Sequence, residues 1–114
     1  MPHPSLAKIL RLHFSETDKY GGRPLYEAII QKCKDLNIAG ATVFQGLEGF
    51  GEMAEIHKRH IAGHGEPIVV VVADSAENIE RLLPIIEDMM HTGTIAVSEA
   101  EVIRVQKGGK TANV

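Results

Sequence analysis

Apolar and polar side chains alternate along the first part of the chain. Leu10 and Leu12 share one parity, whereas Arg11 and His13 occupy the other. Because successive side chains of a strand point to opposite faces, this period of two is typical of a strand with one buried face. Residues 6–14 are therefore predicted to form a strand.

A polar stretch, residues 15–22, follows this strand. Gly21 and Gly22 allow the chain to turn there, because glycine adopts positive φ angles without steric cost. Glu16 and Asp18 are interpreted as solvated surface charges. The stretch is therefore predicted to be an exposed loop.

Helical spacing begins after this loop. The apolar residues of the segment 25–36 recur every three to four positions: Leu25, Ile29, Ile30, Cys33 and Leu36. This spacing is typical of the buried side of an amphipathic helix. Gly40, after a turn at Asn37-Ile38, is interpreted as the signal that ends the helix. Cys33 is interpreted as a buried small hydrophobe rather than a nucleophile, and a second strand is predicted over 41–46.

The β-branched run 68–72 shows no alternation. Such a run is typical of a central strand whose two faces are both covered. A second helix is predicted to begin with Asp74 or Ser75 as its cap and to end at Gly93. The apolar stripe of this helix comprises Ile79, Leu82, Leu83, Ile86, Met89 and Met90.

The last strand is predicted in two pieces. Residues 95–97 form the first piece and residues 102–105 the second, with a bulge over 98–101 between them. Arg104 lies in the second piece. The tail 107–114 has little to bury and is predicted to fray.

These segments follow the order β-α-β-β-α-β. The order predicts an α+β fold: a ferredoxin-like sandwich with a four-stranded antiparallel sheet and two helices on one face. Residues 1–114 are predicted to form a single domain. Ile9, Val43 and alternate valines of 68–72 are predicted to lie on the other face of the sheet. Because that face is too apolar for water, we expect a homo-oligomer that packs sheet faces together.

Composition and charge exclude several classes of function. A net charge of -3 with two Tyr, three Phe and no Trp gives no support for binding to nucleic acid or to an anionic membrane. One cysteine cannot form an internal disulfide or a cysteine-based zinc site. No apolar run approaches the roughly 20 residues of a membrane span, and the N-terminus lacks the apolar core of a signal peptide. We therefore expect a cytoplasmic protein without membrane insertion. Because no nucleophile can be paired with a base, we do not expect an enzyme.

The strand 41–46 runs into a stretch with three glycines within six residues. Exposed backbone N–H groups in such a stretch can bind an anion such as a phosphate. The candidate ligand contacts in this stretch are Gln45, Gly46, Gly49, Phe50 and Gly51. A bend that uses glycine only for backbone freedom is the alternative, since neither Walker nor Rossmann spacing is present.

A histidine-rich segment follows the glycines. His57, His60 and His64 stand at i, i+3 and i+7. On a helix the three imidazoles would share a face, and Glu52 or Glu55 could add an oxygen ligand for zinc or another transition metal. A solvated, basic, mobile loop is the alternative, and the sequence leaves both open.

Several motifs resemble those of the PII signalling proteins. Residues 40–43 followed by Glu48-Gly-Phe-Gly51 are similar to the second PII strand and the Lys-Gly-Phe-Gly sequence that leads into its mobile T-loop. Residues 15–20, 23–28 and 46–51 are more similar still to a PII-like branch of uncharacterised proteins. The resemblance covers nearly the whole chain and implies a nitrogen-regulatory PII-like fold, with the T-loop at about 52–66.

The resemblance also implies a function. It implies a homotrimer that binds an adenine nucleotide in clefts between subunits and controls a partner protein, such as a transporter or an enzyme, through the T-loop. AMP or ADP is the ligand implied for this chain, and no cofactor is required. The residues that match nucleotide contacts of the family are Thr42, Gly49, Gly51, Thr92, Gly93 and Arg104.

The chain departs from the family pattern at four places, the first of which is one extra residue between Val43 and Gly49. Glu52-Met53 replaces an Arg-Gln pair, the phosphate loop after Gly93 is shortened, and Gln106 replaces a second arginine. Because each missing charged hydrogen bond costs about 1.5–3 kcal/mol, a triphosphate should suffer most. Related trimers are linked to divalent-cation tolerance, so a metal-tolerance trimer using His57, His60 and His64 is the alternative function.

Overall fold

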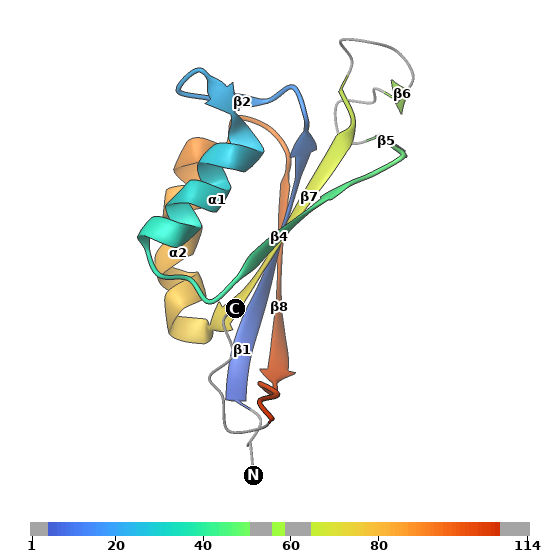
Figure 1. The fold of residues 1–114 in the computed structure, drawn as a ribbon. Helices are drawn as coiled ribbons and strands as arrows, with labels where there is room; N and C mark the ends of the chain where they lie inside the picture. Colours follow the sequence, from blue (N-terminus) through green and yellow to red (C-terminus); the bar gives the residue numbers. More distant parts are fainter. Residues whose placement is uncertain (1–4, 51–55, 59–64, 108–114) are drawn as a thin grey trace.

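Four strands form the central sheet, which is antiparallel throughout and has the order β4-β7-β1-β8 (Figure 1). The bounds are Ser5–Ser15 for β1, Ala41–Gln45 for β4, Pro67–Ser75 for β7 and Thr94–Val102 for β8. Two helices, α1 (Leu25–Asp35) and α2 (Ala76–Met89), cover one face. The computed structural model describes residues 5–50, 56–58 and 65–107. The order of these elements confirms the predicted α+β ferredoxin-like sandwich.

Two short ladders accompany the sheet. β2 (Lys19–Tyr20) pairs with β3 (Arg23–Pro24), and β5 (Glu48–Phe50) pairs with β6 (Ile56–Lys58). Gly21 and Gly22, with φ angles of 59° and 82°, form the two-residue turn between β2 and β3. Two positive φ angles are the requirement of a type I′ hairpin turn. The stretch predicted to be a loop therefore contains a hairpin.

The core lies between the sheet and the helices. Leu12 pairs with Val70 and Leu10 with Val72 in the register of β1 and β7, and all four side chains are 0% exposed. The fully buried helix residues that complete this core are Leu25, Ile29, Ile79, Leu82 and Ile86. Each such side chain contributes roughly 1.5–3 kcal/mol by leaving water, so this face carries most of the stabilisation of the fold.

α1 ends at the turn predicted for Asn37-Ile38. Asn37 has a positive φ of 57°. The Ile38 N–H donates to the Cys33 oxygen at 2.9 Å, and the Asn37 N–H donates to the Lys34 oxygen at 3.1 Å. This pair of bonds is the Schellman arrangement, in which asparagine can replace glycine. Asn37, within the predicted turn, therefore ends the helix, and the end signal assigned to Gly40 lies beyond it.

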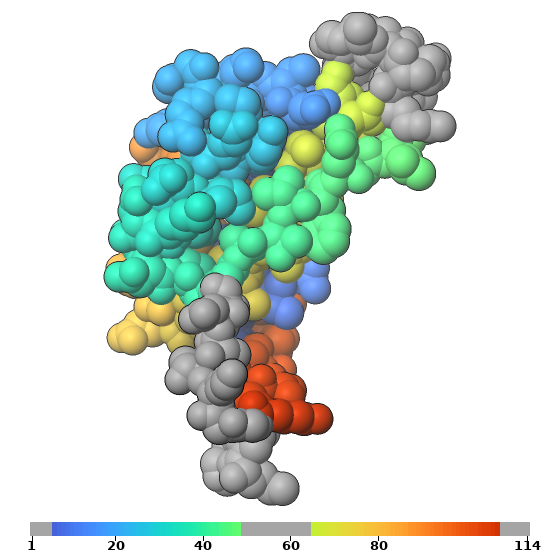
Figure 2. Space-filling view, viewed as in Figure 1, coloured from blue at the N-terminus to red at the C-terminus, as the bar shows by residue number. Residues whose placement is uncertain are grey.

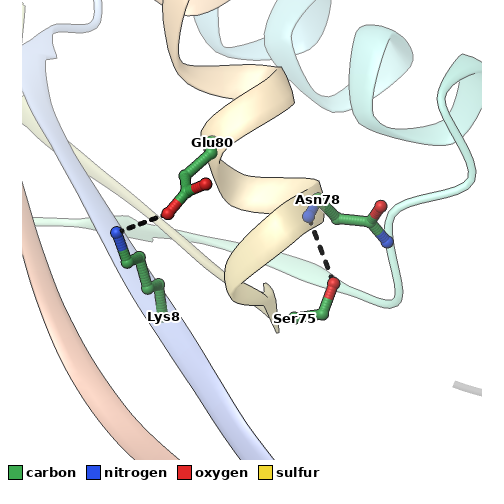
Figure 3. Close-up of polar contacts among 4 residues, drawn as sticks. All are labelled: Lys8, Ser75, Asn78 and Glu80. Carbon is green, nitrogen blue, oxygen red and sulfur yellow. Dashed lines mark hydrogen bonds and ion pairs between the residues drawn. The ribbon is translucent and has the colours of Figure 1, made fainter.

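α2 begins at one of the two predicted caps. The Ser75 hydroxyl accepts a hydrogen bond from the Asn78 N–H at 3.1 Å, and Lys8 pairs with Glu80 on the first turns at 3.0 Å (Figure 3). The helix ends at Met89, before the predicted end at Gly93. Within residues 5–50, 56–58 and 65–107, neither helix is long and apolar enough to cross a membrane.

Among the residues that the structure describes, no helix covers the opposite face of the sheet, and we call it the open face (Figure 1). Ile9, Val69 and Val71 lie on it and are half-buried, as predicted. Val43 was predicted on the same face, but it pairs with Val70 and therefore points to the helices. The prediction is wrong because pairing register, which decides the face, is not encoded in one strand alone.

β8 also differs from the prediction. It is one continuous strand, and Glu99 and Glu101 pair with Lys8 and Leu6 of β1. The predicted bulge over 98–101 is therefore wrong, because an edge strand tolerates exposed charged side chains without interruption. The strand ends at Val102, so the predicted second piece and the strand position of Arg104 are also wrong.

Candidate ligand-binding site

One end of the sheet gathers four of the predicted ligand contacts: Gln45, Gly46, Thr92 and Gly93. Gln45 lies level with Ile68, and Ile68 with Phe14. One more residue of the β1–β8 register places Gly93 level with Phe14; a Cβ on Gly93 would lie 3.3 Å from the Phe14 Cβ. We call residues 15–18, 45–46, 65–67 and 92–93 the loop end of the sheet.

Gly46 and Gly93 are both required by the backbone of the loop end. The Gly46 N–H donates to the Pro67 oxygen at 2.7 Å, and a Cβ on Gly46 would lie 2.8 Å from the Pro67 side chain. Gly93 has a φ of 120°, and a Cβ there would overlap the His13 carbonyl oxygen. Because β4 and β8 are three strand spacings apart, the two glycines lie about 14 Å from each other.

A hydrogen-bonded turn, residues 15–18, lies between these glycines. The Ser15 N–H donates to the Asp18 carboxylate at 2.9 Å, and the Asp18 N–H donates to the Ser15 oxygen at 3.0 Å. The Asp18 oxygen accepts the Leu25 N–H at the start of α1 at 2.8 Å. The interpretation of Asp18 as a solvated surface charge is therefore wrong, because its carboxylate closes the turn.

The same turn holds the segment that leads into β7. The Glu16 N–H donates to the Glu66 oxygen at 2.8 Å, and the Glu66 N–H donates to the Glu16 carboxylate at 3.0 Å. Gly65 has a φ of 74°, and a Cβ there would lie 2.8 Å from the Ser15 hydroxyl oxygen. Glu16 is thus also a structural acceptor, although its side chain is exposed.

Glu66 is a feature of the loop end that the sequence analysis missed. Its Oε2 atom is buried and has no hydrogen-bond partner in the part of the chain that the structure describes. Buried acceptors are normally satisfied, so a donor from a ligand or from a second protomer would be stabilising here. The available signal was a carboxylate directly before the apolar run of β7, where the chain returns from the glycine-rich stretch.

Thr42 and Arg104 lie away from the loop end. Thr42 is exposed on the open face, where it pairs with Val71. Arg104 follows the far end of β8 and is exposed. The nine residues of β8 separate it from Thr92 by at least about 27 Å. One protomer therefore cannot bring Arg104 and the loop end onto one nucleotide.

The remaining candidates fall in or near the β5–β6 ladder. Gly49 pairs with His57, and Phe50 lies in β5. His57 thus lies in a strand, so the helical face considered for the three histidines does not include it. The candidates outside the described residues are Gly51, Glu52, Glu55, His60 and His64. No group of three His, Cys, Asp or Glu in the described residues could hold a metal ion, and the histidine hypothesis stays a prediction.

Two further features bear on chemistry. Burial raises the pKa of the Cys33 thiol to about 11, because the apolar surroundings disfavour the thiolate. Cys33 is 3% exposed, which agrees with the predicted structural role. A groove of about 300 Å³ lies between α1 and β4, which are adjacent in Figure 2, and is lined in part by Arg23, Tyr26, Lys34 and Val43. None of the described residues that line it belongs to the loop end.

Comparison with known proteins identifies relatives of this chain. The model of the family DUF190, described as "Uncharacterized ACR, COG1993", matches residues 7–102. A UPF0166 protein of Aquifex aeolicus (strain VF5) is 36% identical over 98 residues, which cover 84% of this chain and 92% of the relative. UPF0166 protein MJ1524 of Methanocaldococcus jannaschii is 33% identical over 101 residues, which cover 86% of this chain and 93% of the relative.

Solved structures share the fold at low sequence identity. CPII of Thiomonas intermedia K12, bound to ADP and bicarbonate, has a TM-score of 0.62 and 20% identity, covering 90% of this chain and 93% of CPII. A putative PII-like signaling protein of Thermus thermophilus has a TM-score of 0.60 and 16% identity, covering 90% and 92%. The divalent ion tolerance protein CutA1 of Ehrlichia chaffeensis has a TM-score of 0.58 and 11% identity, covering 91% and 87%. These similarities confirm the PII-like fold.

Proposed function

Since this chain belongs to the DUF190 family and has a PII-like fold, we propose that it is a regulatory protein that binds an adenine nucleotide. AMP or ADP is the proposed ligand, and no cofactor and no catalysis are part of the proposal. CPII, which shares the fold, is bound to ADP, AMP and bicarbonate in one solved structure. Fold similarity alone does not assign a ligand, so the proposal depends on the candidate residues themselves.

The observation that carries the proposal is the division of these residues between the two ends of β8. Thr92 and Gly93 precede the strand, and Arg104 follows it. A nucleotide is much shorter than the roughly 27 Å between them. We therefore infer that the loop end of one protomer and Arg104 of the next line one cleft, and that the protein acts as a homotrimer with a cleft at each subunit boundary.

The charges of the loop end favour a ligand with few phosphates. Glu16, Asp18 and Glu66 are its acidic residues, whereas Arg104 is the basic residue among the proposed contacts. Because carboxylates repel phosphate oxygens, each added phosphate raises the electrostatic cost of binding. We expect AMP and ADP to bind, and ATP to bind about tenfold more weakly than ADP, which corresponds to one charged hydrogen bond.

The regulatory step follows from where the ligand would sit. Gly46 precedes the T-loop stretch and Gly65 lies near its end; Gly46 contacts Pro67, and Gly65 lies close to Ser15. A ligand that contacts Gly46 and Gly93 would favour one arrangement of these ends over another. The nucleotide would thereby control the surface offered to a partner protein, such as a transporter or an enzyme.

Isothermal titration calorimetry with AMP, ADP and ATP tests the proposal. Arg104→Gln should weaken ADP binding by at least about tenfold, because a charged hydrogen bond to phosphate is lost. Arg81→Gln is the matched control: Arg81 is exposed on α2 and bonds only to Asn78 among the described residues. Absence of binding by all three nucleotides at millimolar concentration would refute the proposal. Equal weakening by both substitutions would remove Arg104 from the site.

A further inference from the structure

The open face carries positive charge without compensating negative charge. Arg11 and His13 lie two positions apart on β1, so both side chains point to this face. Both are exposed. The described residues of β4, β7 and β8 that point to the same face are Thr, Phe, Pro, Val, Ala and Ser residues. None of these is acidic.

Hydroxyl groups flank the two basic side chains. The Arg11 Nη1 atom donates to the Ser98 hydroxyl at 3.2 Å, which directs the guanidinium toward β8. Thr94 lies directly opposite His13 in the β1–β8 register. Guanidinium, imidazole and hydroxyl groups are all donors to oxyanions, and arginine can give two parallel bonds to one carboxylate or phosphate. Neighbouring strands are about 4.8 Å apart and alternate residues about 6.8 Å apart, so one small anion can contact donors on both strands.

The apolar side chains beside Arg11 and His13 explain why an anion would be needed. Ile9, Val69 and Val71 are half-buried beside Arg11 and His13, and the proposed homotrimer covers them. Covering the face brings copies of Arg11 together in a region of low dielectric. An unpaired buried charge is strongly unfavourable there, and like charges add repulsion.

We propose that Arg11 and His13, with the hydroxyls of Thr94 and Ser98, bind a small oxyanion of the phosphate, sulfate or carboxylate class on the open face. The anion neutralises this face when copies of the chain assemble through it. The site is centred on Arg11, which lies at the middle of β1 and points to the open face, although Thr94 directly follows Gly93 of the loop end. The inference depends on the proposed assembly but not on the proposed ligand.

Sedimentation velocity over a range of protein concentrations tests this inference. The assembly is measured in chloride and then with millimolar sulfate, phosphate or succinate at equal ionic strength. These low concentrations limit the general salting-out effect of sulfate. An oxyanion that binds the assembly but not the free protomer should strengthen association about tenfold or more at concentrations well above its dissociation constant. Succinate distinguishes a carboxylate ligand from an inorganic one.

Arg11→Met and Arg81→Met form a matched pair for the same measurement. Arg11→Met should assemble in chloride at least as strongly as the unchanged protein does with the oxyanion, and its response to the oxyanion should disappear. This follows because a buried charge replaced by an apolar side chain of similar size is often neutral or stabilising. Arg81→Met, on the helix side, should keep the full response.

Three results would overturn the inference. One is an association that none of the three oxyanions strengthens. A second is an Arg11→Met variant whose association is strengthened as much as that of the unchanged protein. A chain that stays monomeric in every buffer is the third, and it would also refute the homotrimer. ADP titration of the same samples separates the two proposals, because an oligomer that binds ADP but ignores oxyanions refutes the anion site alone.

Discussion

The two faces of the central strand β7 differ although the strand is apolar on both. Val70 points to the helices and is 0% exposed, whereas Val71, the next residue, points to the open face and is half-buried. The protein's own helices cover the first face. The second face pairs its valines with Arg11 and His13 of β1. An unbroken β-branched run therefore indicates that both faces of a strand are to be buried. In this fold the helices of the same chain bury one of these faces.

The largest expected difference between the faces comes from Val70→Ala and Val71→Ala. The first substitution leaves a cavity in the core and should cost about 2–3 kcal/mol. The second removes part of an accessible side chain and should cost less than about 1 kcal/mol in the unassociated chain. Urea unfolding followed by circular dichroism, at several protein concentrations, measures both. If the cost of Val71→Ala grows with protein concentration, the open face lies in an interface. If Val70→Ala and Val71→Ala cost the same at every concentration, the two faces do not differ as described.

A smaller effect is expected from Gly93→Ala, at the point where β8 begins. A Cβ there would overlap the His13 carbonyl oxygen, and alanine would have to adopt a φ of 120°, so the cost should be about 2 kcal/mol. Gly22→Ala is the control, because its φ of 82° is also positive but nothing lies within 4 Å. That change should cost only about 1 kcal/mol. Thermal unfolding compares the two variants, and similar losses would argue against close packing at Gly93.

Substitutions of two serines should change the free energy of unfolding by smaller amounts. Ser75→Ala removes the hydroxyl that accepts the Asn78 N–H at the start of α2 and should cost about 1 kcal/mol. Ser98→Ala removes an exposed hydroxyl on the open face, where it bonds to Arg11, and should change the free energy of unfolding by less than about 0.5 kcal/mol. Urea unfolding at low protein concentration checks both values. A reversed order would mean that the cap does not stabilise α2.

The reaction rate of the Cys33 thiol tests burial on the helix side without a change in stability. Its pKa is raised to about 11 by burial, so the folded protein should react very slowly with a thiol reagent at pH 8. The introduced thiol of Ser98→Cys, on the open face, should react at the rate of a free thiol. Comparable rates would contradict the burial of Cys33.

The same shift in the pKa of Cys33 gives a pH dependence. From about pH 9, the ordinary value, up to about 11, the unfolded chain loses the thiol proton before the folded chain does. The folded state binds more protons in this window, so its stability should fall as the pH rises through it. Urea unfolding of the protein and of Cys33→Ala across this window isolates the contribution of the thiol. If the stabilities of the two proteins change with pH in the same way, the expected contribution of the thiol is refuted.

Local sequence predicted the elements and the fold order. The alternation in 6–14, the helical spacing in 25–36 and the run 68–72 each match an observed element, because side-chain period is a property of the strand or helix itself. One of the errors lies at two polar positions. Glu99 and Glu101 suggested an interruption, but β1 supplies the pairing partner for β8 from a distant part of the chain.

The candidate site was predicted only in part. The glycines at 46 and 93 were found, because close backbone approach requires glycine. Glu66 was missed, and Asp18 was taken for a surface charge, because their roles depend on hydrogen bonds across the loop end. Residue type does not reveal the geometry of such bonds.

The side-chain pattern along the chain was enough to locate the strands and helices and to predict that β7 is apolar on both faces. The pairing of the strands was needed to place Val43 toward the helices, and Arg11 and His13 among half-buried valines. The tertiary structure also placed Thr92 and Arg104 at opposite ends of β8. The physical reason is register, since a shift of one residue between paired strands exchanges the two faces of the sheet.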